Sequence, residues 1–81
     1  MADSLRSRLL KVLSTVTQDA LPDDPEVSLF EGGLLDSFVL PDLLSALEQE
    51  FAFKIPDSDM RARKFDSIAL IEAYVSERAG V

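Results

Sequence analysis

The chain has 81 residues, 47% of them hydrophobic, and contains no cysteine and no histidine. Fifteen acidic and eight basic residues give a net charge of −7, which disfavours nucleic acid and anionic membranes as partners because both would repel the chain. The missing histidine and cysteine exclude Ser-His and Cys-His catalytic sets. The length predicts a single domain over residues 1–81 that depends on packed helices for its stability.

The first residues carry no basic region followed by an apolar stretch, so no export signal is visible. No apolar run approaches the roughly 20 residues that a membrane span needs. We therefore expect a cytoplasmic protein without membrane insertion, and we expect a monomer.

Apolar residues at three- and four-residue spacing predict a first amphipathic helix over residues 3–18, with Asp3 or Ser4 as its N-cap. Two prolines and two aspartates within residues 21–25 end this helix. A long loop then runs to Gly32-Gly33. We expect the loop to be held on the core by Val27, Leu29 and Phe30.

A second helix is predicted to begin near Asp36 or Ser37 and to end near Phe51, and its apolar residues share one face. These are Leu40, Leu43, Leu44, Leu47 and Phe51. A short helical turn is expected over residues 58–62. The last helix is expected to begin at Asp66 or Ser67 and to bury Ile68, Ile71, Tyr74 and Val75.

Strand-like alternation is absent, so the pattern predicts an all-α fold. It is a small bundle of three main helices plus one short helix, with a long loop between the first and second helices.

Four Asp-Ser dipeptides occur along the chain, and such pairs commonly cap helices. They are Asp3-Ser4, Asp36-Ser37, Asp57-Ser58 and Asp66-Ser67. Only the pair at 36–37 follows two glycines and two leucines and precedes a helix with an acidic exposed face. We therefore interpret the other three pairs as caps and treat Ser37 as a candidate attachment point.

Further sequence elements follow this pair in a fixed order. Gly33-Leu34-Leu35-Asp36-Ser37-Phe38 leads into the apolar run of residues 43–51, then Ile55-Pro56, then Phe65-Asp66-Ser67-Ile68. This order resembles the attachment motif of acyl and peptidyl carrier proteins, and the likeness covers nearly the whole chain. The run over residues 29–37 looks closer to discrete aminoacyl carriers, notably D-alanyl carrier proteins, than to fatty-acid carriers.

The resemblance implies that a phosphopantetheinyl transferase moves 4′-phosphopantetheine from coenzyme A to Ser37. The thiol of this group then holds a carboxylic acid as a thioester, which suits a chain without cysteine. Asp36 matches a residue that caps the helix and contacts the transferase, although the cap alone would also account for it. The implied protein is not an enzyme. Its further partners are an acyl- or aminoacyl-loading ligase or adenylating enzyme, and downstream synthases or transferases.

The exposed face of the second helix is expected to carry Phe38, Asp42, Ser45 and Gln49, with Glu48 at its border. A solvated helix face is the simpler interpretation of the charges. An aromatic ring directly after the serine favours a partner contact instead, so we assign Phe38, Asp42 and Glu48 to partner binding. Pro41 is unusual for the family because it removes a backbone hydrogen bond near the helix start.

Two questions stay open at this point. A small acidic helical interaction domain without a prosthetic group is the alternative function. For a carrier, the sequence does not specify the cargo, which is fatty acyl, polyketide, aminoacyl or D-alanyl.

Overall fold

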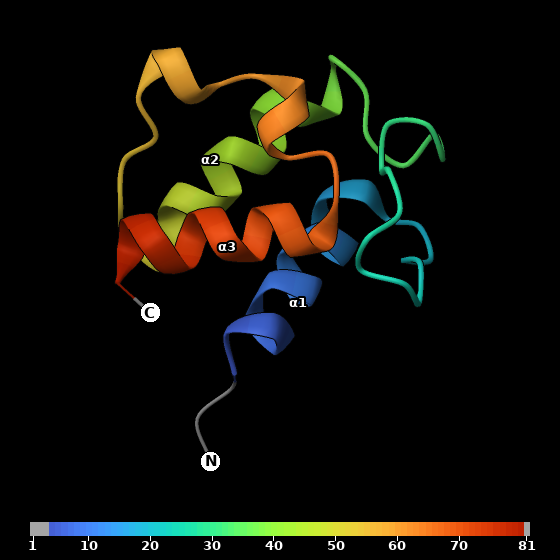
Figure 1. Ribbon diagram of the computed structural model, residues 1–81, viewed down its shortest axis with the longest axis horizontal. Coiled ribbons are helices and arrows are strands. Elements are labelled where there is room, and N and C mark those ends of the chain that lie inside the picture. The colour runs from blue at the N-terminus through green and yellow to red at the C-terminus, as the bar shows by residue number, and fades with distance from the viewer. Residues whose placement is uncertain (1–3, 81) are drawn as a thin grey trace.

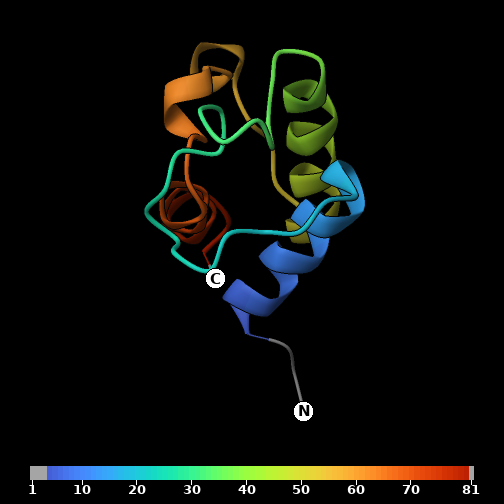
Figure 2. The same cartoon turned by 90° about the vertical axis from the view of Figure 1, so that its right-hand side faces the viewer.

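The computed structural model describes residues 4–80, and these contain three α-helices and two 3-10 turns. Helix α1 spans Leu5–Thr17, α2 spans Val39–Phe51 and α3 spans Ile68–Ala79. The 3-10 turns η1, Asp57–Asp59, and η2, Ala62–Lys64, connect α2 to α3. Figure 1 shows the two turns at the same end of the molecule as the start of α2, and Figure 2 shows the same relation from the side. The predicted all-α class with a long first loop is confirmed.

The region between α2 and α3 differs from the prediction of one short helix over residues 58–62. The carbonyl of Asp59 accepts a 2.8 Å hydrogen bond from the N–H of Arg61, which turns the chain sharply at Met60. This turn separates η1 from η2, so two 3-10 turns replace the single helix.

The core is formed by one apolar face of each α-helix together with anchors from the loops. Its fully buried side chains include Leu9 and Leu13 of α1, Leu43 and Leu47 of α2, Ile71 and Val75 of α3, and Leu29, Leu35 and Phe65. Leu40 and Tyr74, both expected inside, are half-buried. Val27 was expected on the core and is instead 40% exposed.

The long α1–α2 loop is tied to the start of α3 through Asp66. The carboxylate of Asp66 accepts hydrogen bonds from Ser28 Oγ at 2.7 Å and from the N–H of Phe30 at 3.1 Å. The carbonyl of Asp66 accepts one from the N–H of Leu29 at 2.6 Å. With the loop held by these bonds, Leu29 is buried in the core and Val27 lies at the surface. They also fix the path of the loop towards the candidate site.

Serine side chains cap two of the three α-helices. Ser4 Oγ accepts from the N–H of Ser7 in α1, and Ser67 Oγ accepts from the N–H of Leu70 in α3. Asp3, the alternative cap of α1, lies outside the described residues. The cap prediction for Asp57-Ser58 was wrong, because η1 has no side-chain cap. None of the helices within residues 4–80 is long and apolar enough to cross a membrane.

Candidate functional site

The segment before Ser37 is a tight, anchored turn. Gly33 has a φ of +80°, in the left-handed region that other residues rarely adopt. The N–H groups of Leu34 and Leu35 both donate to the carbonyl of Leu29, at 3.0 and 3.1 Å. The side chain of Leu35 is 1% exposed and fixes the turn to the core. Ser37 therefore emerges from a well-positioned backbone into solvent.

Asp36 caps the start of α2. Its Oδ1 accepts hydrogen bonds from the N–H groups of Phe38 at 2.8 Å and Val39 at 2.9 Å, and its carbonyl accepts from Leu40 N–H at 2.9 Å. Of the two caps considered from the sequence, the structure therefore selects Asp36. The hydroxyl of Ser37 is exposed and has no hydrogen-bond partner within residues 4–80. It is therefore free to be modified without breaking a helix cap.

Regular helix begins at Val39, later than the predicted start at residue 36 or 37. In an α-helix the carbonyl of Ser37 would accept from the N–H of residue 41, but Pro41 has none. The hydrogen-bond ladder is therefore interrupted, and Ser37 and Phe38 form a turn. This arrangement keeps Ser37 outside the rigid part of α2.

A groove of about 280 Å³ opens beside Ser37 between α2 and the turn after η1. Its lining residues are Ser37, Leu40, Pro41, Leu44, Ser45, Glu48 and Met60. Leu40 is half-buried because it borders this groove. The groove joins the exposed hydroxyls of Ser37 and Ser45 to a mainly apolar wall.

The predicted exposed face of α2 is present. Phe38 is 87% exposed, and Asp42, Ser45 and Gln49 are exposed along the helix. An aromatic ring held this far into water directly after Ser37 is an unusual feature of the surface.

Two of the three acidic residues of α2 have hydrogen-bond or ion-pair partners, and the third has none in the described part of the chain. Glu48 Oε2 accepts a 2.8 Å hydrogen bond from the N–H of Ile55 and so holds the chain that leaves the helix. Glu50 pairs with Arg8 of α1 at 2.9 Å. Asp42 has no such partner in the described part of the chain. A helical projection cannot reveal these engagements, because both partners come from outside α2.

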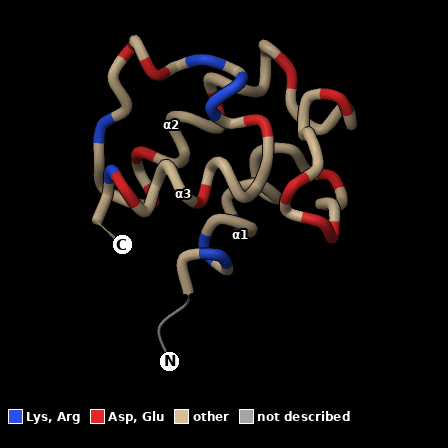
Figure 3. Tube along the Cα trace, in the orientation of Figure 1, with Lys and Arg blue, Asp and Glu red and all other residues tan. Residues whose placement is uncertain are grey.

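Negative charge gathers on the loop that leads to Ser37 (Figure 3). Within residues 18–38 the sequence has no Lys or Arg. Its acidic residues there are Asp19, Asp23, Asp24, Glu26, Glu31 and Asp36. Six acidic residues and no basic residue therefore lie on the segment between α1 and α2 that leads to the serine, whereas α2 itself carries three acidic residues.

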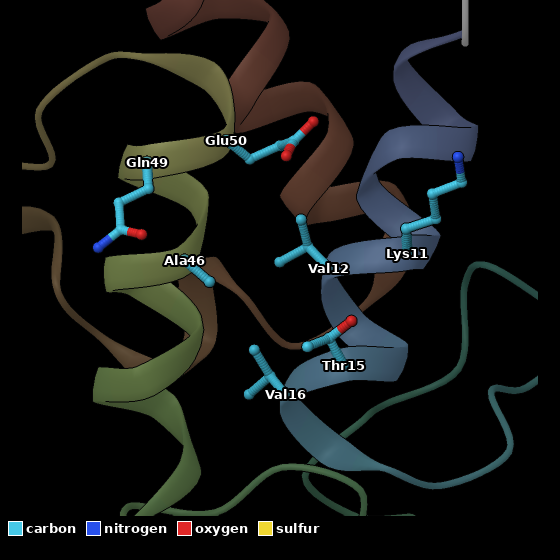
Figure 4. A pocket seen from close by; sticks show the side chains of 7 residues that line it. All are labelled: Lys11, Val12, Thr15, Val16, Ala46, Gln49 and Glu50. Atoms are coloured by element: carbon cyan, nitrogen blue, oxygen red, sulfur yellow. The ribbon is translucent and has the colours of Figure 1, made fainter.

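A second, larger hollow of about 450 Å³ lies between α1 and α2. Figure 4 shows Val12, Val16 and Ala46 facing into it, with Lys11 and Glu50 at its edges. Its lining does not include Asp36, Ser37 or Phe38. The candidate site therefore consists of Ser37 and the smaller groove.

A protein-family model described as the phosphopantetheine attachment site matches residues 7–75. The chain belongs to this family. Members of the family carry 4′-phosphopantetheine on a serine, and they are carriers rather than enzymes. The match decides against an interaction domain without a prosthetic group.

Several relatives of this carrier are D-alanyl carrier proteins. One from Bacillus velezensis is 42% identical over 52 residues, which cover 63% of this chain and 67% of the relative. D-alanyl carrier protein 1 of Lactiplantibacillus plantarum is 29% identical over 73 residues, 90% of this chain and 91% of the relative. A third, from Leuconostoc mesenteroides, is 28% identical over 94% of this chain and 97% of its own length.

Proposed function

We propose that Ser37 is the residue to which 4′-phosphopantetheine is attached, and that the chain is a single carrier domain over residues 1–81. The observation that carries this proposal is the division of roles in the Asp36-Ser37 pair. Asp36 caps α2, so the exposed Ser37 hydroxyl takes part in no hydrogen bond within residues 4–80. A transferase can therefore modify it without opening the fold.

The residues around Ser37 suit a long, partly apolar group. The groove beside the serine offers apolar contacts from Leu40, Leu44 and Met60, and hydroxyl and carboxylate groups from Ser45 and Glu48. When bound, the group supplies the thiol that the chain lacks, since the sequence contains no cysteine. Ser37 would hold the group covalently, and the apolar wall of the groove would contact its chain.

We assign the partner contacts to the surface around Ser37. Phe38 has the exposure expected of an aromatic anchor that enters an apolar pocket of a partner. Asp42 offers a free carboxylate one turn further along α2, and Glu48 borders the same groove. Asp36 is placed to contact the transferase beside the serine. The acidic approach loop favours partners with basic surfaces.

The cargo that we propose is an aminoacyl group, with D-alanine as the first candidate, because the relatives are D-alanyl carrier proteins. The corresponding partners are a phosphopantetheinyl transferase, an adenylating ligase that loads the amino acid, and a downstream transferase. We place this carrier in the cytoplasm as a discrete monomer, where coenzyme A is the donor of the group.

The attachment is tested by intact mass after incubation with coenzyme A and a broad-specificity phosphopantetheinyl transferase. The expected result is one added phosphopantetheinyl unit, which Ser37→Ala abolishes. Ser45→Ala, which removes another exposed hydroxyl of the same groove, should be modified like the wild type. A free-thiol assay should detect the modified protein only. An unmodified wild-type mass under conditions that modify another carrier would disprove the assignment.

The cargo is tested separately with the modified protein. A D-alanine ligase from one of the relatives' organisms should add one D-alanyl unit with ATP, and a thiol-blocking reagent should prevent the addition. Loading by a fatty-acyl ligase but not by this enzyme would overturn the aminoacyl assignment and leave the attachment site intact.

A further inference from the structure

Asp59 is a buried carboxylate outside the attachment motif, and three side chains hold it. It is 7% exposed at the end of η1. Tyr74 of α3 donates its hydroxyl to Oδ2 at 2.8 Å, and Arg78 of α3 pairs with the same oxygen at 3.0 Å. Lys64 of η2 donates to Oδ1 at 3.1 Å. A carboxylate that is removed from water and held this fully fixes η1 to α3.

The backbone of Asp59 also determines the conformation of Met60. Met60 has φ −79° and ψ 65°, and the carbonyl of Asp59 accepts from the N–H of Arg61 across it. These values describe an inverse γ-turn centred on Met60. The N–H of Asp59 donates to the carbonyl of Pro56 at 2.9 Å. The direction of the Met60 side chain is therefore set by a residue whose own side chain is locked to α3.

Met60 forms the part of the Ser37 groove that does not belong to α2. All the other lining residues lie on α2 or directly before it. The chain between α2 and α3 is held at its start by the hydrogen bond from Ile55 to Glu48, and further along by Asp59. The second tie lies directly beside Met60 in the chain, so it is the one best placed to hold Met60 relative to α2.

We propose that Asp59 is a positioning residue for the groove beside Ser37: its contacts with Tyr74, Lys64 and Arg78 hold Met60 in place as the wall opposite α2. The shape of the groove then depends on a cluster on α3 that takes no part in attachment. The use of this groove by the group on Ser37 rests on the proposed function, whereas the effect of Asp59 on Met60 does not.

The surroundings of Tyr74 make it a firm anchor for this cluster. Its ring packs edge-on against Phe65 at 5.0 Å between centroids and lies 6.4 Å from Phe53. Arg78 lies over the same ring at 5.6 Å. Burial, followed by the hydrogen bond to Asp59, raises the pKa of Tyr74 to about 12, so the hydroxyl remains a donor over the physiological range. The hydrogen bond from Tyr74 is also the main cause that lowers the pKa of Asp59.

The test uses the unmodified full chain labelled with ¹³C at the methionine ε-methyl groups. The chain has two methionines, so the Met60 signal can be assigned by comparison with Met60→Leu. Met60 is 40% exposed in the wild type, so in Asp59→Ala we expect its signal to move towards that of a methionine that rotates freely in water. Amide exchange at Met60 and Arg61 should accelerate about tenfold or more, as the loss of a charge-assisted hydrogen bond permits local opening. Asp59→Asn and Tyr74→Phe should give smaller changes in the same direction.

Glu72→Gln is the matched control. Glu72 forms a two-point contact with Arg6 at 2.7 and 2.9 Å, which joins α3 to α1 rather than to η1. This variant should lower the thermal stability without moving the Met60 signal. If folded Asp59→Asn and Tyr74→Phe leave both the signal and the exchange unchanged, or if Glu72→Gln changes them equally, the proposal is wrong.

A final arm connects the effect to Ser37. Attachment of the phosphopantetheinyl unit should shift the Met60 signal of the wild type and shift it less in Tyr74→Phe. An unmodified wild-type mass would refute the attachment, while the data on the unmodified chain would still decide the role of Asp59. A modified wild type with an unshifted Met60 signal would show that the group does not use this groove.

Discussion

Substitution of Asp36 separates its structural role from its proposed contact with the transferase. Asp36→Ala removes the acceptor of two backbone hydrogen bonds, from Phe38 at 2.8 Å and Val39 at 2.9 Å. Loss of such a cap costs about 1 kcal/mol of unfolding free energy, within a range of roughly 0.5–2. Asp36→Asn keeps an oxygen acceptor at the same place and removes the charge. We therefore expect Asp36→Asn to unfold within about 0.5 kcal/mol of the wild type.

The assay pairs urea unfolding with the rate of Ser37 modification by the transferase. Asp36→Ala should lose both stability and rate, whereas Asp36→Asn should lose mainly rate, by about tenfold or more if a charged contact is removed. Ser4→Ala removes the equivalent acceptor on α1, where Ser4 binds the N–H of Ser7 at 3.1 Å. It should reduce stability by a similar amount and leave the rate unchanged. Wild-type modification of Asp36→Asn would refute the transferase contact, and wild-type stability of Asp36→Ala would refute the cap.

Two further predictions concern the partner surface and pH. Phe38→Ala should leave the unfolding free energy within about 0.5 kcal/mol, because the ring is 87% exposed, yet reduce kcat/KM of the transferase about tenfold or more. Leu70→Ala, at an exposed apolar side chain of α3, is the control and should change neither. Because contacts with Tyr74 and Arg6 lower the pKa values of Asp59 and Glu72, their stabilisation is complete above pH 4.5 and is lost as the pH falls through the lowered values. Since the pKa of Tyr74 is raised to about 12, its contribution is complete below pH 10 and is lost between pH 10 and about 12. Circular dichroism as a function of pH would test the loss of stability at both ends of the pH range, and tyrosinate absorbance would test the raised pKa of Tyr74. An ordinary titration of the single tyrosine in the folded protein would contradict that raised pKa.

The helices and most of the core follow from the spacing of apolar residues, because that spacing directly determines which face of a helix can be buried. The conformations of the loops between the helices are predicted less well from this spacing, because they depend on contacts with residues distant in the sequence. Asp66 was a candidate cap of α3, yet its carboxylate binds Ser28 and Phe30 of the first loop. No local pattern indicates that choice, because it depends on the packing of the first loop against the start of α3.

The carboxylates near the candidate site also depend on contacts that the spacing of residues does not predict. Spacing predicted the exposed positions of α2 but not which carboxylates remain free. Glu48 and Glu50 are engaged by Ile55 and Arg8, which are distant along the chain or beyond the helix end. The acidic approach to Ser37 therefore comes mainly from the loop before it. This distribution is visible in the sequence, which has no Lys or Arg between residues 18 and 38.

Pro41 explains why the Asp36-Ser37 pair behaves differently from its counterparts. At a helix start, the carbonyl of the capping residue accepts from the N–H four residues later. Ser4 does so with Arg8 at 3.0 Å and Ser67 with Ile71 at 3.0 Å, and in each case the serine hydroxyl is used in the cap.

For Ser37 the residue four positions later is Pro41, which has no N–H to give. Asp36 is therefore the capping residue in place of Ser37. Its carbonyl accepts a hydrogen bond from the N–H of Leu40 at 2.9 Å, and its carboxylate accepts those of Phe38 and Val39. A residue that interrupts the helix thus leaves the hydroxyl of Ser37 outside the cap, unlike the hydroxyls of Ser4 and Ser67, and so available for the attachment that we propose.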